Sequence, residues 1–348
     1  MIKDVTRCNC GVPEAIAGLF VWTEDGRIES SCGDGFLLVP ATLVNNLNDM
    51  GAGEKADGAL RESYKRILYD NLTDAGRWLI RFPFFRGKWI YSNIEEYPGL
   101  MGHGKVTTVE YRYMKGLVLN VANPVNILVT TEMLAGEFEL FEGREPEIEI
   151  KENGETEVRM QRNGRRKKRS IKNLELPESG MGPYCAECGV PEEVGRRFLW
   201  DYRMGLITDR YTGTRMAFVP MSWVSVISSL NEEEERRDPV YTAAHEVFLK
   251  TAIRDPEADS LLLTLKDLWV CGLGRVDGVT NWEQGIEVEA SGVCADSVSA
   301  GKLVSACEKV TGDIAREVEW KREGNRVKMH VMVNKEQLER VLGADWPG

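Results

Sequence analysis

One stretch of this chain occurs twice, once near the N-terminus and once near the middle. Residues 8–14 read CNCGVPE and residues 185–192 read CAECGVPE. Similar residues follow both stretches in the same order through each half of the chain. The matched positions are Phe20 with Phe198, Trp22 with Trp200, Ile28 with Ile207, Gly102 with Gly272, Gly104 with Gly274, Leu134 with Leu303 and Gly143 with Gly312. Agreement over a whole half-chain is typical of an internal duplication.

The repeated unit is about 170 residues long, which is the size of a domain and too long for a solenoid repeat. We therefore predict a first repeat over residues 1–165 and a second over residues 181–348. The segment 166–180 between them is polar and basic, and we interpret it as a linker.

Each unit is predicted to contain the same elements. An Asp-Gly turn at residues 25–26 separates two apolar runs and predicts a hairpin. A helix is expected after Pro40 and after Pro220, and a longer helix follows where apolar residues recur at spacings of three and four. Those residues are Leu60, Tyr64, Ile67, Leu68, Leu72 and Ala75 in the first half, and Tyr241, Ala244, Phe248 and Ala252 in the second.

The second part of the unit is predicted to contain strands and one more helix. Residues 109–113 alternate between apolar and charged, and Gly116 separates them from an apolar run at 117–121. A helix over 128–141 comes next, and a charged hairpin turns at Asn153-Gly154. The predicted fold class is α+β, with antiparallel sheets and packed helices in each of two duplicated domains, both led by a cysteine-containing hairpin.

Composition limits the functional classes. The chain is 43% hydrophobic and 28% charged, as expected of a globular protein, and its net charge of −11 disfavours nucleic acid as a partner. No apolar run has the length of a membrane span, and the start lacks the pattern of a signal peptide, so a cytoplasmic location is expected. The basic run 165–169 is interpreted as a solvated linker, with contact to an anionic partner as the alternative.

The order of elements resembles the 4-vinyl reductase domain, which is related in fold to haem-nitric-oxide-binding domains. The resemblance covers about 100 residues of each half. It rests on Ala75-Gly76-Arg77, Gly102 to Val106, Leu134 to Phe138 and Gly143 in the first half, and on Gly272 to Val276, Leu303 to Cys307 and Gly312 in the second. It implies a pocket between helix and sheet for a small hydrophobic molecule, or a role in tetrapyrrole metabolism.

Several members of that family carry a cysteine-rich zinc site near the C-terminal hairpin. Here that hairpin, residues 145–160, contains no cysteine, so those ligands cannot be carried over. The cysteines of this chain have to be interpreted separately.

The cysteine pairs have the form of metal-binding loops. Cys185 and Cys188 have the spacing of a zinc knuckle, and Cys8 and Cys10 form a looser version of it. Neither pair completes a tetrahedral site alone, but equivalent positions in two packed halves would bring all four together. We expect zinc first and an iron–sulfur cluster second.

Other interpretations of the cysteines stay open at this point. Cys32 could join Cys8 and Cys10 in a separate site, or all of these residues could be reduced thiols that cap short hairpins. A thioredoxin-like role is disfavoured because the pair precedes a hairpin and not a helix of a βαβ unit. The remaining cysteines are expected in the core, since their surroundings are apolar or small; they are Cys271, Cys294 and Cys307.

Two further features suggest a ligand. His103 lies between two glycines, where it could face a ligand or an axial haem position, although a surface turn is the favoured interpretation. Aromatic residues also cluster before Gly102 and could line an apolar pocket or simply fill a core or an interface. The candidate ligand-binding residues among them are Trp78, Phe82, Phe85 and Trp89.

No catalytic residue is predicted, because the sequence has no nucleophile elbow and no histidine pair with metal-binding spacing. We expect a non-catalytic protein that binds a small hydrophobic molecule or tetrapyrrole, or an accessory protein, with a structural cysteine-ligated metal. The alternative is a metal- or cofactor-dependent enzyme, linked to an iron–sulfur cluster or haem, in tetrapyrrole or anaerobic metabolism. A protein partner and an oligomeric state are both left open.

Overall fold

The structure is a computed structural model of the chain. It describes residues 6–51, 53–72, 94–112, 115–152, 156–166, 184–231, 238–251, 265, 267–282, 285–311, 315 and 317–332. Helices and antiparallel sheets occur together throughout these ranges, which confirms the predicted α+β class.

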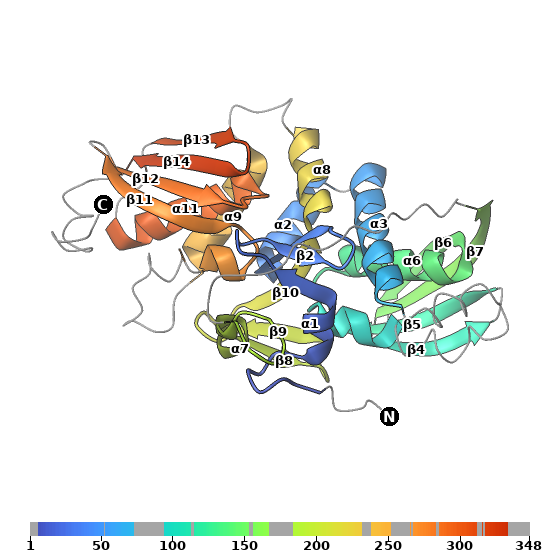
Figure 1. Cartoon of the computed structure of the whole chain (residues 1–348). Helices are drawn as coiled ribbons and strands as arrows, with labels where there is room; N and C mark the ends of the chain where they lie inside the picture. The colour runs from blue at the N-terminus through green and yellow to red at the C-terminus, as the bar shows by residue number, and fades with distance from the viewer. Residues whose placement is uncertain are drawn as a thin grey trace.

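A six-stranded antiparallel sheet at the centre is built by both halves of the chain (Figure 1). Its order is β1-β2-β3-β10-β9-β8. The strands are β1 Phe20–Trp22, β2 Ile28–Ser30, β3 Gly35–Pro40, β8 Phe198–Asp201, β9 Leu206–Asp209 and β10 Arg215–Pro220. At the middle of the sheet Leu38 on β3 lies opposite Phe218 on β10, and the flanking pairs are arranged symmetrically about them. The two halves are therefore joined by backbone hydrogen bonds and related by an approximate two-fold axis.

Each half adds a four-stranded antiparallel sheet of its own, and the two lie at opposite ends of the molecule (Figure 1). The first has the order β4-β5-β7-β6 and the second the order β11-β12-β14-β13, so the same connection pattern occurs twice. The strands are β4 Lys105–Arg112, β5 Gly116–Ala122, β6 Arg144–Glu152, β7 Thr156–Arg166, β11 Arg275–Trp282, β12 Gly285–Ser291, β13 Glu317–Glu323 and β14 Arg326–Met332.

Helices of one half pack against helices of the other. The long helices are α2 Ala41–Gly51, α3 Glu54–Asp70, α6 Ile127–Glu142, α8 Met221–Asn231, α9 Pro239–Lys250 and α11 Asp296–Thr311. Within the halves, α3 packs on α6 and α9 on α11, while α3 also contacts α8 and α2 contacts α9 across the junction. A hydrogen bond of 2.7 Å between the hydroxyls of Ser63 and Ser222 marks one of these crossings.

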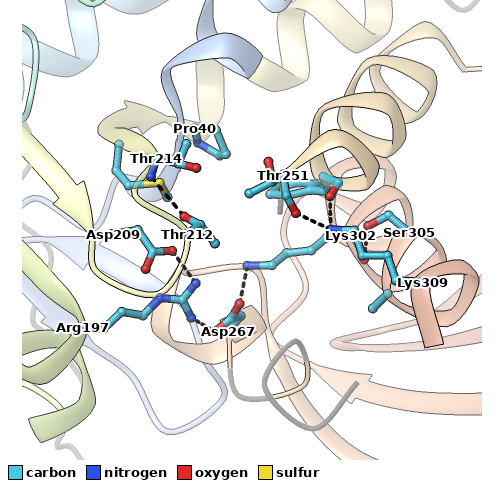
Figure 2. Close-up of a pocket in the computed structure, with 13 residues that line it drawn as sticks. Pro40, Arg197, Asp209, Thr212, Thr214, Thr251, Asp267, Lys302, Ser305 and Lys309 are labelled. Atoms are coloured by element: carbon cyan, nitrogen blue, oxygen red, sulfur yellow. Dashed lines mark hydrogen bonds and ion pairs between the residues drawn. The ribbon is translucent and has the colours of Figure 1, made fainter. Parts of the chain in front are cut away.

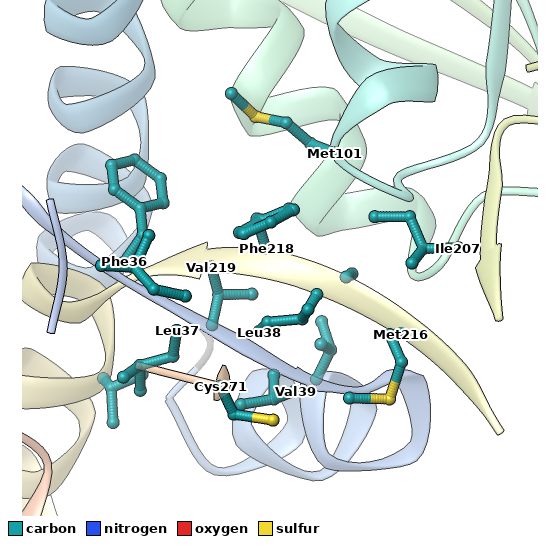
Figure 3. Close-up of a cluster of buried hydrophobic side chains, with 14 of the residues drawn as sticks. Phe36, Leu37, Leu38, Val39, Met101, Ile207, Met216, Phe218, Val219 and Cys271 are labelled. Atoms are coloured by element: carbon teal, nitrogen blue, oxygen red, sulfur yellow. The ribbon is translucent and has the colours of Figure 1, made fainter. Parts of the chain in front are cut away.

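The largest core lies at the junction of the halves (Figure 3). Buried side chains of β3 and β10 meet there, and the ring of Phe20 stacks on Phe218 with centroids 4.6 Å apart. Smaller cores lie under each outer sheet, for example around Phe138 and around Leu303. Because apolar burial is the dominant favourable term in folding, this shared core ties the halves together energetically.

Most predicted elements are present, with two differences. The helix predicted over 128–141 is α6, and the predicted hairpin is β1–β2. Two six-residue helices, α1 Glu14–Leu19 and α7 Glu192–Arg197, were not predicted. Strand β7 extends to Arg166, and the rest of the predicted linker lies outside the described residues. Within the described part of the chain, no helix is both long enough and apolar enough to cross a membrane.

Candidate metal centre

Each cysteine pair lies in a tight loop that closes on itself. The backbone N–H of Cys8 donates to the carbonyl of Val12 at 2.9 Å, and that of Cys185 donates to Val190 at the same distance. A glycine follows the second cysteine of each pair in the left-handed region, Gly11 with φ 95° and Gly189 with φ 70°, where a side chain would be strained. The repeated sequence thus folds into two equivalent loops.

The two loops meet, although they are far apart in the sequence. The sulfur of Cys8 is 3.4 Å from that of Cys185, and the sulfur of Cys10 is 3.5 Å from that of Cys188. All four sulfurs lie within 4.8 Å of one another. The structure therefore brings together the four cysteines that the sequence predicted as ligands.

These distances suit a single metal ion. A tetrahedral zinc–thiolate site with bonds of about 2.3 Å separates its sulfurs by about 3.8 Å. The distances of 3.4 and 3.5 Å and the upper limit of 4.8 Å lie around this value. They are too long for disulfides, in which the sulfurs are about 2.05 Å apart. In an iron–sulfur cluster the thiolates bind different iron atoms, which spreads them more widely than a mononuclear site does.

Backbone dipoles favour ionisation at one of these sulfurs. The backbone N–H groups of Cys188 and Glu187 approach Cys185 and lower the pKa of its thiol to about 7. Burial instead raises the pKa of Cys188 to about 11. At Cys8 the backbone N–H of Cys10 lowers the pKa, but burial and the neighbouring Glu187 and thiols outweigh it, so the net pKa is raised. A metal ion would displace the protons that remain on the sulfurs.

Glu187 connects the two loops and was not predicted to do so. Its carboxylate accepts hydrogen bonds from the thiol of Cys8 at 3.1 Å and from the backbone N–H of Asn9 at 3.3 Å. The signal available in the sequence was its place between Cys185 and Cys188, where a side chain projects from the knuckle. Glu187 thus holds the first loop against the second.

The backbone of α7 presses on the first loop. A Cβ atom added to Gly195 would lie 2.1 Å from the carbonyl oxygen of Cys10, and one added to Gly11 would lie 3.3 Å from the carbonyl oxygen of Gly195. Only glycine at position 195 lets the helix approach the loop this closely. The packing of α7 therefore sets the position of Cys10.

The four cysteines would fill every coordination position of a tetrahedral metal ion, and this limits the chemistry of the site. Four thiolates fill the coordination of a tetrahedral ion and leave no position for water or substrate, whereas catalytic zinc keeps one open. Cys8 is buried and the other three cysteines are half-buried. Closed groups of four thiolates of this kind are typical of structural zinc sites.

The other cysteines lie apart from this group. Cys32 is buried on the turn after β2, where its sulfur is 3.0 Å from the hydroxyl of Ser30, and it does not join Cys8 and Cys10. Cys271 and Cys307 are buried, as expected for core residues. Cys294 is only half-buried and donates to the carbonyl of Gly292 at 3.1 Å.

His103 is buried, so its interpretation as a surface turn was wrong. The ring Nε2 lies 2.7 Å from both the hydroxyl of Tyr64 and the carbonyl oxygen of Phe218. Burial lowers the pKa of His103 to about 4, which keeps the ring neutral. The side chain thereby connects the first half to β10 of the second. A turn between glycines looked exposed in the sequence because the covering strand comes from the other half.

The aromatic candidates Trp78, Phe82, Phe85 and Trp89 lie outside the described residues, and so does the pocket that they were predicted to line.

Comparison of the chain with models of protein families, with curated proteins and with solved structures gives no match. The class that the fold and the site define is an α+β protein with a four-cysteine group able to hold a metal ion.

Proposed function

We propose that one zinc ion, bound by Cys8, Cys10, Cys185 and Cys188, fastens the two halves of this protein, and that the protein is a non-catalytic binding or accessory protein. The observation that carries this proposal is the convergence of the four sulfurs within 4.8 Å of one another, with two from each half. Zinc is favoured over other metals because a closed site of four thiolates is typical of structural zinc.

The type of ligand that we propose is taken from the resemblance to tandem 4-vinyl reductase domains. The matching strand orders of the two outer sheets support an origin by duplication. On this proposal the ligand is a small hydrophobic molecule or a tetrapyrrole, and the metal is not part of the ligand site. The metal would instead hold the paired halves in the arrangement that forms the binding surface.

An enzyme with an iron–sulfur cluster or haem is the alternative, and two observations count against it. The sulfurs are packed too closely for thiolates that bind separate iron atoms. The Nε2 of His103, the proposed axial ligand, already has two hydrogen-bonding partners in the buried interior. The sulfurs would have to move apart to bind a cluster, and the hydrogen bonds of His103 would have to break before its Nε2 could bind haem iron.

The test is metal analysis of protein purified without oxygen, together with an absorbance spectrum. We expect one zinc per chain and no visible absorbance, and we expect Cys188→Ser to lose the metal. Cys294→Ser is the matched control, because this thiol lies outside the group and should leave the zinc content unchanged. Iron with visible absorbance would favour the alternative. Full-length protein that carries no metal and takes up none from added zinc would refute the proposal.

A further inference from the structure

A small cavity formed mostly by the second half is lined by charged side chains (Figure 2). It lies between the turn that joins β9 to β10, the end of α9 and one face of α11. Its volume is about 50 Å³. No local sequence pattern predicts it, since its residues come from segments far apart in the chain.

Four buried charges form a connected cluster at one wall of the cavity. The guanidinium of Arg197 donates to Asp209 at 2.7 Å and also pairs with Asp267. The ammonium of Lys302 lies 3.5 Å from a carboxylate oxygen of Asp267. Each of these side chains is at most 9% exposed. Burying charges is costly even when they are paired, and apolar replacement of such a cluster is often neutral or stabilising.

The first half shows that the fold does not need these charges. The positions equivalent to Arg197 and Lys302 are occupied by Leu19 and Met133, both of which are buried. Leu19 and Arg197 are the last residues of α1 and α7. Helices α6 and α11 have the same length, and Met133 and Lys302 are each the seventh residue.

The two carboxylates are also specific to the second half. Backbone hydrogen bonds establish one correspondence, because Met101 donates to the carbonyl of Tyr97 as Cys271 does to that of Asp267. Asp209 ends β9, whereas Ser30 ends the equivalent strand β2. A tyrosine and a serine therefore replace the two acids. The second half therefore has a buried charge cluster at a site where the first half has uncharged residues.

The cavity carries an excess of positive charge. Lys309 lies two helical turns after Lys302 on α11 and also lines the cavity, with its ammonium bonded to the carbonyls of Phe248 at 2.5 Å and Thr251 at 2.6 Å. Among the described lining residues there are three cations, Arg197, Lys302 and Lys309, and two anions, Asp209 and Asp267. The Nε of Arg197 is buried without a hydrogen-bonding partner.

We propose that this cavity is a binding site for a small oxyanion, a carboxylate or a phosphate, held by Lys302 and Lys309. A ligand with a single negative charge would balance the one excess positive charge and would offset the desolvation cost of burying that cation. On the scale where one water needs about 10–15 Å³, the cavity holds roughly four heavy atoms. That is the size of acetate or inorganic phosphate and excludes a nucleotide or a tetrapyrrole.

The proximity of the two lysines is consistent with this assignment. Burial lowers the pKa of Lys302, and burial together with the charge of Lys302 lowers the pKa of Lys309. A bound anion within reach of both ammonium groups would relieve both effects. None of the four cysteines lines this cavity, so anion binding can be tested independently of metal binding.

The test is titration calorimetry of the full-length protein with sodium acetate and, separately, with inorganic phosphate, against sodium chloride at matched ionic strength. We expect saturable binding of at least one probe beyond the chloride baseline, and which probe binds identifies the anion as a carboxylate or a phosphate. Lys309→Gln should weaken that binding at least tenfold. Lys250→Gln should change it less than twofold, because Lys250 is exposed on neighbouring α9 and does not line the cavity.

A second variant uses the residue of the first half. Lys302→Met places at this site the side chain that the fold accepts at position 133 and should abolish binding. The absence of saturable binding of either probe to the wild-type protein would overturn the proposal. Binding that Lys309→Gln leaves unchanged would overturn it as well.

Discussion

Substitution of Gly195 by alanine tests whether packing sets the position of the cysteine loops. The added Cβ would lie 2.1 Å from the carbonyl oxygen of Cys10, and real Cβ contacts are essentially never shorter than 3.0 Å. The position of a Cβ atom is fixed by its own backbone and the carbonyl oxygen is itself backbone, so no side-chain rotation can relieve the contact. The loop that carries Cys10 therefore has to move by about 1 Å, because a close-packed interior transmits such strain.

A shift of this size is larger than a metal site accepts. Metal–ligand distances in working sites stay within about 0.2 Å of their ordinary values. Overpacking typically costs about 1–3 kcal/mol, which corresponds to roughly 5- to 150-fold in affinity. We expect the dissociation constant for zinc to rise within this range in Gly195→Ala, measured by competition with a chromophoric chelator.

Gly18→Ala is the matched control. Gly18 lies in the equivalent short helix α1, and a Cβ added there meets no atom within 4 Å. Its zinc affinity should match that of the wild type, and its stability should stay the same or rise by up to about 1 kcal/mol, because alanine is the better helix former. If Gly195→Ala binds zinc as tightly as Gly18→Ala, the reasoning that α7 positions Cys10 is refuted.

Three further measurements follow from the structure. Cys188→Ser should lower the free energy of unfolding of the zinc-loaded protein by more than the roughly 1–3 kcal/mol expected for Cys307→Ser, a buried core thiol, and equal losses would argue against a structural metal. Burial lowers the pKa of His103 from 6.5 to about 4 in the folded state, so the unfolded chain binds more protons and the free energy of unfolding falls as the pH drops below 6.5. Between pH 8 and pH 5 in denaturant titrations, the wild type should therefore lose about 2 kcal/mol more stability than His103→Leu. Parallel stability profiles of the two proteins would contradict a buried neutral ring. A protease site introduced between residues 170 and 179 should give two fragments that stay together on a sizing column, because β3 and β10 pair within one sheet, whereas separated fragments would contradict that pairing.

Several features followed from local patterns in the sequence. Helix α6 and the β1–β2 hairpin were predicted because their apolar spacing and turn residues act over a few neighbouring positions. The short helices α1 and α7 were missed because six residues are too few to show a helical period. The glycine that follows each cysteine pair was also visible in the sequence, and glycine favours a tight turn.

The candidate sites were only partly visible in the sequence. The spacing and repetition of the cysteine pairs were enough to name Cys8, Cys10, Cys185 and Cys188 as one set of candidate ligands. The same evidence also allowed two separate sites, including one with Cys32. The cluster of Arg197, Asp267 and Lys302 had no signal at all, because each residue looks like an ordinary charge in its own segment.

The sequence by itself therefore determined most of the element types, the repetition and the candidate metal-binding residues, because these depend on neighbours along the chain. Only the tertiary structure decided that the two cysteine loops meet, that His103 is covered by β10, and that charges from distant segments share one cavity. Those facts depend on the pairing of β3 with β10 and on which helices cross the junction. Such long-range contacts are set by the burial of the shared apolar core, which is non-directional. The local apolar pattern therefore shows which residues are buried but not which distant segment covers them.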